Sequence, residues 1–345
     1  MGRAAGPVSC GRGHAPRRRP AQRGDLGRGA GQARARCRAR CGARRGSGGR
    51  AMIAPADLTH CEEAIRTGSL SFHAASKVLP EKVRAPALAL YAFCRLADDA
   101  VDLNDEKSAA VLSLGERLER VYQGRPRNTP TDRAFAAMVE GFEMPRALPE
   151  ALLEGLAWDA MERRYATLSD VYAYSARVAA AVGAMMCVLM RTRCPNALAR
   201  ACDLGVAMQL SNIARDVGED AEARRVYLPL EWLDEIGLTP EALFADPRPT
   251  PGLRRLIKRL VADSNRLYIR ADAGIPALPL ACRPGIYAAR YIYAGIGQDI
   301  ARAGYDSLTR RARTGMAQKL GWLGLSVAVS GLSLVSPRSA VLYAR

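Results

Sequence analysis

The spacing of apolar residues constrains this chain more than any other feature of its sequence. From residue 52 onward, apolar side chains recur every three or four positions, and alanine and leucine predominate. This period is that of a helix, and the strict alternation typical of strands is missing from the sequence. Proline- and glycine-containing breaks punctuate the pattern, among them Pro80, Pro86 and Pro195. The sequence therefore predicts a single all-α domain over residues 52–345.

The first 51 residues have a different composition. They contain 14 Arg, 12 Gly and a single acid, so they carry +13 of the chain's formal charge of +17. Such a segment lacks the apolar side chains that a core requires, and we expect it to be disordered. Three interpretations remain: an RNA-binding Arg/Gly arm, an organelle-targeting peptide, or translated upstream sequence. The abrupt change at Met52 favours the third, an extension that is not native.

The remaining 294 residues carry only +4, so we expect no nucleic-acid partner for the folded domain. The sequence contains no Cys-x-x-Cys pair and no Walker A motif, and the domain has only two histidines, His60 and His73. These facts argue against a zinc ribbon, a nucleotide site and a serine-hydrolase triad. The six cysteines of the domain are scattered through apolar segments, which is typical of reduced thiols in a cytoplasmic protein.

One predicted helix, residues 85–102, is apolar on nearly every side but carries a polar stripe. Its sequence is APALALYAFCRLADDAVD. Four polar residues at i, i+4, i+7 and i+11 share one helical face: Tyr91, Arg95, Asp98 and Asp102. Asp99 points about 100° away from that face. Because an isolated buried carboxylate is costly, the stripe requires a partner or a metal.

A second predicted helix, residues 203–220, repeats this arrangement. Its sequence is DLGVAMQLSNIARDVGED. Four polar residues at i, i+3, i+7 and i+11 share a face: Gln209, Asn212, Asp216 and Asp220. Arg215 stands beside this stripe, as Arg95 stands within the first. A single Asp-x-x-x-Asp pair is usually a solvated face, but two pairs on two apolar helices, each with an arginine, indicate a shared site.

Two such stripes facing each other would form an acidic, oxygen-rich cavity. Oxygen ligands favour Mg²⁺ or Mn²⁺ over zinc, and Mg²⁺ commonly bridges a few carboxylates to phosphate oxygens. Arg95 and Arg215 supply planar donors that match phosphate. The surrounding aliphatic helices suit a long hydrocarbon. The pattern predicts a site that holds a diphosphate, promotes its departure, and protects the resulting allylic cation from water.

The chain resembles the bacterial phytoene synthases of the squalene/phytoene synthase family over residues 57–320. The resemblance rests on SFHAASKVLP (71–80), LYAFCRLADDAVD (90–102), RRYATLSDVYAYSARVAAAVG (163–183), QLSNIARDVGED (209–220) and RVYLP (225–229). It implies an isoprenoid-synthase-type helical bundle with a central cavity. It also implies that two geranylgeranyl diphosphates condense head to head, via prephytoene diphosphate, to phytoene, the first committed step of carotenoid biosynthesis, with Mg²⁺ or Mn²⁺ as cofactor.

The resemblance also assigns roles to individual residues. The implied metal ligands are Asp98, Asp102, Asn212, Asp216 and Asp220. The implied catalytic residues are Tyr91, Arg95, Asp98, Asp102, Tyr165, Asp216 and Asp220. The implied substrate contacts are Ser69, Ser71, Phe72, Tyr91, Arg95, Gln209, Asn212, Arg215, Tyr293 and Arg311. For Tyr165, which would act in the first half-reaction, a packed tyrosine with a structural role is an equal alternative.

Two other functions remain open. A squalene or dehydrosqualene synthase would use farnesyl diphosphate, and squalene formation would also require a nicotinamide cofactor, which we do not expect here. A non-catalytic assembly factor of the same fold is disfavoured, because the chain retains all four outer aspartates of the two stripes.

Two uncharged segments bear on membrane contact. Residues 178–190 are too short to span a bilayer, which takes about 20 residues. Residues 320–337 predict a final helix, either a core helix, which we favour, or a membrane contact. A long-chain substrate and product favour peripheral contact with a membrane. We therefore expect a cytoplasmic, membrane-associated protein that passes its product to a downstream carotenoid enzyme.

Overall fold

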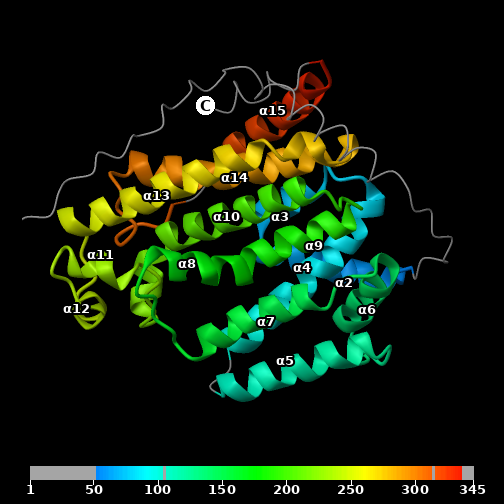
Figure 1. The fold of residues 1–345 in the computed structure, drawn as a ribbon, viewed down its shortest axis with the longest axis horizontal. Coiled ribbons are helices and arrows are strands. Elements are labelled where there is room, and N and C mark those ends of the chain that lie inside the picture. The colour runs from blue at the N-terminus through cyan, green and yellow to red at the C-terminus, as the bar shows by residue number, and fades with distance from the viewer. Residues whose placement is uncertain (1–51, 104–105, 313–314, 336–345) are drawn as a thin grey trace, which may run out of the picture. The chain divides into compact units, whose positions relative to one another are not determined.

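The computed structural model describes residues 52–103, 106–312 and 315–335. These residues all belong to one compact unit. Within these ranges the secondary structure consists of helices, with no strand (Figure 1). The predicted all-α fold is therefore confirmed for the described part of the chain. The Arg/Gly-rich extension expected over residues 1–51 lies outside the described residues.

The helices follow one another along the chain with short connections. Their bounds are α2 Pro55–Gly68, α3 Leu70–Ser76, α4 Glu81–Asp102, α5 Lys107–Tyr122, α6 Pro130–Phe142, α7 Ala147–Ala160, α8 Leu168–Ser175, the π-helical turn η1 Ala176–Ala180, α9 Ala181–Leu189, α10 Pro195–Glu222, α11 Leu230–Asp234, α12 Pro240–Ala245, α13 Pro251–Asp272, the 3₁₀ turns η2 Ile275–Ala277 and η3 Leu280–Cys282, α14 Arg283–Arg302 and α15 Met316–Val335.

Local sequence signals explain where many of these helices begin. Five start on a proline, whose missing N–H has no partner in a first turn anyway: Pro55, Pro130, Pro195, Pro240 and Pro251. At α8, Thr167 and Asp170 form a reciprocal capping box. The prediction of a helix break at Pro86 is wrong, because α4 continues through this residue. Pro86 is buried, and the packing of α4 outweighs the one backbone hydrogen bond that is lost.

The long helix α10 lies at the centre of the domain. It packs against α13 and α14 on one side and against α8, η1 and α9 on the other (Figure 1). One hydrophobic core cluster joins it to α13, with Leu210, Ile213 and Leu260 among its fully buried members. A helix that is apolar on most faces must be covered on most faces, which is what places α10 inside.

A second hydrophobic core cluster surrounds α4. It brings together residues of α2, α4, α5, α6, α7 and α9, and the rings of Phe93 and Phe135 stack within it at 3.8 Å between centroids. The two polar stripes are therefore carried by helices of two different clusters, α4 in one and α10 in the other. Their meeting point is decided by how the two clusters join.

The helical run Leu168–Leu189, made of α8, η1 and α9, is long and apolar enough to cross a membrane by length and composition alone. It is longer than the segment 178–190 that the charge pattern delimits. In this structure it packs against α7 and α10. Gly205 of α10 lies so close to η1 that a Cβ there would stand 2.6 Å from the Ala180 Cα. The run therefore behaves as a core helix of the domain.

Helix α15 is a surface helix rather than the core helix that the sequence favoured. It packs on α14 and α3, with Val329 and the two serines Ser326 and Ser330 turned inward. On its outer face, Leu325 and Val327 are 40% and 55% exposed. The apolar side chains of α15 are therefore only partly buried.

The cysteines follow the sequence expectation at five of the six positions in the domain. Free thiols are present at Cys61, Cys94, Cys187, Cys202 and Cys282. Cys194 departs from the expectation, since it is disulfide-bonded.

Candidate active site

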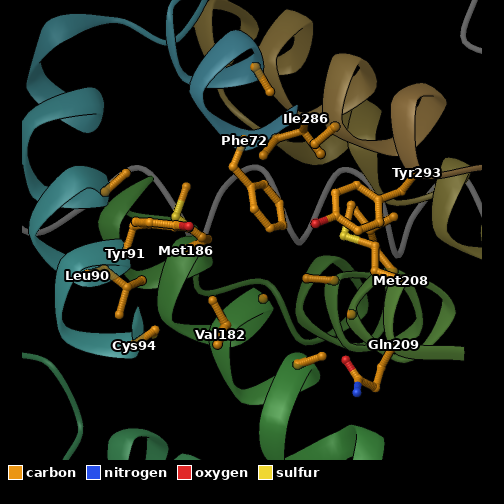
Figure 2. Close-up of a pocket in the computed structure, with 18 of the residues that line it drawn as sticks. Phe72, Leu90, Tyr91, Cys94, Val182, Met186, Met208, Gln209, Ile286 and Tyr293 are labelled. Atoms are coloured by element: carbon orange, nitrogen blue, oxygen red, sulfur yellow. The ribbon is translucent and has the colours of Figure 1, made fainter. Parts of the chain in front are cut away.

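A cavity of about 410 Å³ lies between α4 and α10. Side chains from α3, α7, α8, η1, α9 and α14 are among those that also line it. Figure 2 shows Leu90, Val182, Met186, Met208 and Ile286 around it, so most of the wall is aliphatic. A cavity of this kind is suited to a flexible hydrocarbon chain.

The two polar stripes enter this cavity from opposite walls. Of the predicted residues on the stripes, the ones that line it are Tyr91, Arg95 and Asp98 of α4 and Gln209 and Asn212 of α10. Asp102, Arg215, Asp216 and Asp220 lie further along the same two helices, toward their C-terminal ends. The structure therefore brings the two stripes together at one end of the cavity. On both helices, the part of the stripe that lies outside the cavity is the C-terminal part.

Arginine side chains balance the charge of the α4 stripe. Arg95 pairs with Asp99 at 2.7 Å and lies 3.9 Å from Asp98. Asp99, which the helical period places off the stripe, is thus the main partner of Arg95. Burial raises the pKa of Asp98 to about 6, and the charge of Asp102 acts in the same direction. The positive charges of Arg95 and Arg225 oppose this rise without cancelling it.

The α10 stripe shows the same balance. Asp216 accepts two hydrogen bonds from Arg215 and one from Arg311, whose Nε lies 2.9 Å from Asp216 Oδ1. Arg311, expected as a late basic contact, therefore reaches the stripe from the segment after α14. Burial raises the pKa of Asp220 to about 7, and the charge of Asp216 adds to the effect.

Arg225 links the two stripes, a contact that no local helical period predicts. This residue follows α10, and its Nη1 lies 2.7 Å from Asp102 Oδ1 at the end of α4. The charge of Arg225 also opposes the burial-driven rise in the pKa of Asp98 and of Asp220. The sequence signal for Arg225 is its place in the segment RVYLP, one of the motifs that carry the family resemblance.

The donor set suits a hard divalent cation. Within the described residues no group of three or more His, Cys, Asp or Glu side chains is close enough to hold a metal by itself. Mg²⁺, however, typically takes one or two carboxylates and completes its shell with water and phosphate oxygens. Among the described residues, the buried Asn212 Oδ1 at the stripe has no hydrogen-bond partner, so it is free to serve as a ligand oxygen. The aspartates and Asn212 therefore fit such an ion.

The expected contacts on the N-terminal helices gather beside the cavity. The rings of Phe72 and Tyr293 lie 4.9 Å apart, and both residues line the cavity (Figure 2). Ser69 caps α3 by accepting a hydrogen bond from the Phe72 N–H at 3.2 Å. Ser71 is half-buried on α3 and lies outside the lining.

Tyr165 is placed behind the cavity wall. It is 1% exposed and lies outside the lining, and its hydroxyl has no hydrogen-bond partner within the described residues. Its ring packs 5.2 Å from that of Tyr174, which does line the cavity. Asp159, at the end of α7, is a lining carboxylate that the sequence analysis missed. The only signal was one acid in the apolar segment GLAWDA.

Comparisons with known proteins agree with this geometry. A sequence model described as Squalene/phytoene synthase matches residues 65–318. The chain is 64% identical over 303 residues to a phytoene synthase of Cereibacter sphaeroides, covering 85% of each chain. It is also 64% identical over 294 residues to a phytoene synthase of Rhodobacter capsulatus, covering 83% of this chain and 86% of the relative.

Solved structures share the fold. A crystal structure of a dehydrosqualene synthase in complex with ligand has a TM-score of 0.74 and 29% identity, and the match covers 79% of this chain and 96% of that one. A squalene synthase HpnC from Alicyclobacillus acidocaldarius has a TM-score of 0.67 and 25% identity, covering 73% and 95%. The helical bundle with a central cavity, implied by the sequence resemblance, is thereby confirmed.

Proposed function

Because the chain belongs to the squalene/phytoene synthase family, we propose that it is a phytoene synthase. It condenses two molecules of geranylgeranyl diphosphate head to head, through prephytoene diphosphate, to phytoene, the first committed step of carotenoid biosynthesis. The relatives at 64% identity, both named phytoene synthases, support this substrate over farnesyl diphosphate. The structures named as dehydrosqualene or squalene synthases are much less similar in sequence.

One observation carries this proposal. A single cavity joins an apolar interior to a polar end where carboxylates and arginines of two helices converge. A substrate with a hydrocarbon chain and a diphosphate head matches both parts at once. The largely apolar wall also disfavours water, which would otherwise capture a carbocation and give an alcohol.

Each group at the polar end has a task in this proposal. Asp98 and Asp102 would hold Mg²⁺ or Mn²⁺ on one side, and Asn212, Asp216 and Asp220 on the other. When bound, the metal neutralises the charge of the departing diphosphate. Arg95, Arg215, Arg225 and Arg311, which now pair with aspartates, supply bidentate donors to the diphosphate oxygens. Tyr91, Gln209 and Tyr293 complete the polar lining.

We propose that Tyr165 supports the first half-reaction from its position behind the cavity wall, without contacting the substrate directly. Its hydroxyl has no hydrogen-bond partner in the part of the chain that the structure describes, and the ring of Tyr174 separates Tyr165 from the cavity. Phe72 forms part of the α3 wall against which one prenyl diphosphate would lie, and Ser69 and Ser71 stand beside it on the same segment.

We also propose peripheral membrane contact through α15 and its surroundings. The exposed apolar residues Leu325 and Val327 of α15, Leu70 of α3 and Leu280 of η3 support it. Because α3 and α14 form a wall of the cavity and α15 packs on both, a hydrophobic product leaving there would enter a bilayer or a downstream carotenoid enzyme. Vesicle co-sedimentation of the full chain should fall when Leu325 and Val327 are replaced by Ser; unchanged binding would contradict this surface.

The experiment that tests the activity uses the purified full chain with Mg²⁺ and no nicotinamide cofactor. Geranylgeranyl diphosphate and farnesyl diphosphate are supplied in separate reactions, and the hydrocarbon extract is analysed by mass spectrometry. Phytoene from the first reaction is expected. A thirty-carbon product from the second reaction alone would keep the chemistry and change the substrate. A folded protein that yields neither would refute the proposed function.

Two substitutions separate the polar end from the rest of the fold. Asp98→Ala should abolish metal-dependent turnover while circular dichroism stays unchanged. Arg95→Lys should also reduce turnover, because a point charge cannot replace a bidentate guanidinium. Full activity of Asp98→Ala would remove the basis for a metal at the α4 stripe, and unchanged steady-state constants of Arg95→Lys would remove Arg95 from the diphosphate site.

A further inference from the structure

Asp159 is a carboxylate in the cavity wall to which neither the stripes nor the family resemblance gives a task. It stands at the end of α7, and its neighbours in the lining include the apolar Leu156 and Val178. Its charge interacts with those of Asp102 and Arg225. Asp159 therefore lies within electrostatic reach of the diphosphate end while facing the space where the hydrocarbon would lie.

Two tyrosines hold this carboxylate in place. The Tyr174 hydroxyl donates to Asp159 Oδ2 and the Tyr227 hydroxyl donates to Oδ1, each at 2.8 Å. The two rings pack on each other at 5.2 Å between centroids. Because Tyr174 comes from α8 and Tyr227 from the segment after α10, three parts of the chain fix the position of one carboxylate.

Arg225 is a cation whose charge acts on Asp159, but the two side chains form no ion pair in the described ranges. Asp159 forms none with any other side chain described either, and the guanidinium of Arg225 is engaged with Asp102. Tyrosine hydroxyls are neutral donors, so they orient the carboxylate without cancelling its charge. A charge kept in a largely apolar wall costs free energy, which indicates a use for it.

We propose that Asp159 stabilises the carbocation that forms in the cavity when the diphosphate leaves. The inference rests on the proposed function. In this step the C1–O bond of the prenyl diphosphate breaks, the electron pair leaves with the diphosphate, and a positive charge spreads over the allylic carbons. A fixed negative charge facing those carbons favours the charged state over the neutral ground state.

The two tyrosines solve a problem that such a carboxylate would otherwise create. A free carboxylate close to a carbocation can attack it and form an ester. Here each oxygen already accepts a phenolic hydrogen bond, which lowers its nucleophilicity and restrains its movement. The charge can then act through space. For unit charges about 6 Å apart at an effective dielectric constant of about 20, the effect is roughly 100-fold in rate.

The test compares Asp159→Asn with the wild-type full chain. One readout is the binding, by calorimetry with Mg²⁺ and inorganic diphosphate, of a geranylgeranyl-chain ammonium compound and of its neutral carbon isostere. The wild type should prefer the cationic compound, and Asp159→Asn should lose roughly 100-fold of that preference. The turnover number should fall by a similar factor while KM changes little, because the neutral substrate chain does not sense the charge.

Glu154→Gln is the matched control. Glu154 lies on the same helix, is half exposed and pairs with Arg177 at 2.9 Å. Its neutralisation should leave the preference for the ammonium compound unchanged. Asp159→Glu, which keeps the charge, should retain most of the preference. If Asp159→Asn does not fold, Asp159→Ser provides a second neutral side chain for the same measurement.

The outcomes are separable from those of the proposed function. An unchanged cationic preference in a folded neutral variant would overturn the role of Asp159, even if the wild type makes phytoene. A fall in turnover with no change in the preference would also overturn it, because that result indicates a structural role. The binding readout requires no turnover, so it stands even if the wild type yields no hydrocarbon.

Discussion

The buried ion pair between Asp272 of α13 and Arg290 of α14 allows a quantitative test of what holds the cavity wall together. The guanidinium bonds to both carboxylate oxygens, with Nε–Oδ1 and Nη2–Oδ2 distances of 2.8 Å. The two side chains are 3% and 8% exposed. The Arg290 guanidinium also lies over the rings of Tyr268 and Tyr291, at 5.5 and 5.0 Å from their centroids.

Removal of one partner should be far more harmful than removal of both. Asp272→Leu leaves a guanidinium buried without a counter-charge, which costs about 3–5 kcal/mol. In a domain of this size each kcal/mol lowers the Tm by roughly 2–4 °C, so the expected loss is about 6–20 °C. Arg290→Met should cost a similar amount. The double variant should lie within about 1 kcal/mol of the wild type, because two apolar side chains fill the same space.

The assay is urea unfolding followed by circular dichroism for the wild type, the two single variants and the double variant. Arg248→Ala serves as control, because Arg248 pairs with Asp246 on the surface, at 77% and 54% exposure. It should change stability by less than about 1 kcal/mol. The reasoning would be refuted if Asp272→Leu cost no more than this control, or if the costs of the two single changes simply added in the double variant.

Three further predictions concern the site and its packing. The raised pKa values of Asp98 and Asp220, about 6 and 7, mean that the metal-free protein loses stability from both groups as the pH rises from about 4 to 7. Mg²⁺ affinity should rise about tenfold or more between pH 5.5 and 7.5, measured by Mg²⁺-dependent thermal shifts; a pH-independent affinity would exclude these ligands. Asp216→Asn should lower turnover roughly 100-fold or more with an intact dichroism spectrum, and near-normal kinetics would exclude Asp216 from the diphosphate end. Gly205→Ala should lower the free energy of unfolding by about 1–3 kcal/mol, because its Cβ would meet backbone atoms of η1. Gly115→Ala, which has open space around it, should raise the free energy of unfolding by up to about 1 kcal/mol. Equal Tm shifts for the two variants would contradict the packing of Gly205 on η1.

Much of the site was predictable because its residues recur along single helices. The spacing of Asp98 from Asp102 and of Asp216 from Asp220 places each pair on one face, and α4 and α10 indeed span both segments. A helical period is a local property, so it can be read without knowing the fold. The same holds for the chemistry, since carboxylates and arginines on apolar helices already indicate a charged ligand with a hydrocarbon part.

The sequence was less informative wherever one face of a helix had to be told from its neighbour. Helical geometry put Asp99 off the stripe, yet Asp99 is the main partner of Arg95, because a long arginine side chain reaches one turn along either edge. Likewise, the apolar composition of residues 320–337 favoured a core helix. Whether such a helix is covered depends on how many other elements reach it, and among the described elements α15 packs mainly on α14 and α3.

The tertiary structure alone decided which residues far apart in the chain share the cavity. Asp159 and Tyr227 are 68 positions apart, and Arg225 meets Asp102 across 123 positions. No local period connects such residues, because their contact is set by how the core clusters around α4 and α10 pack together. The sequence by itself determined the helices, the two stripes and the class of ligand, all of which follow from interactions within a few turns. Where the stripes meet, and which carboxylate faces the hydrocarbon, depended on long-range packing.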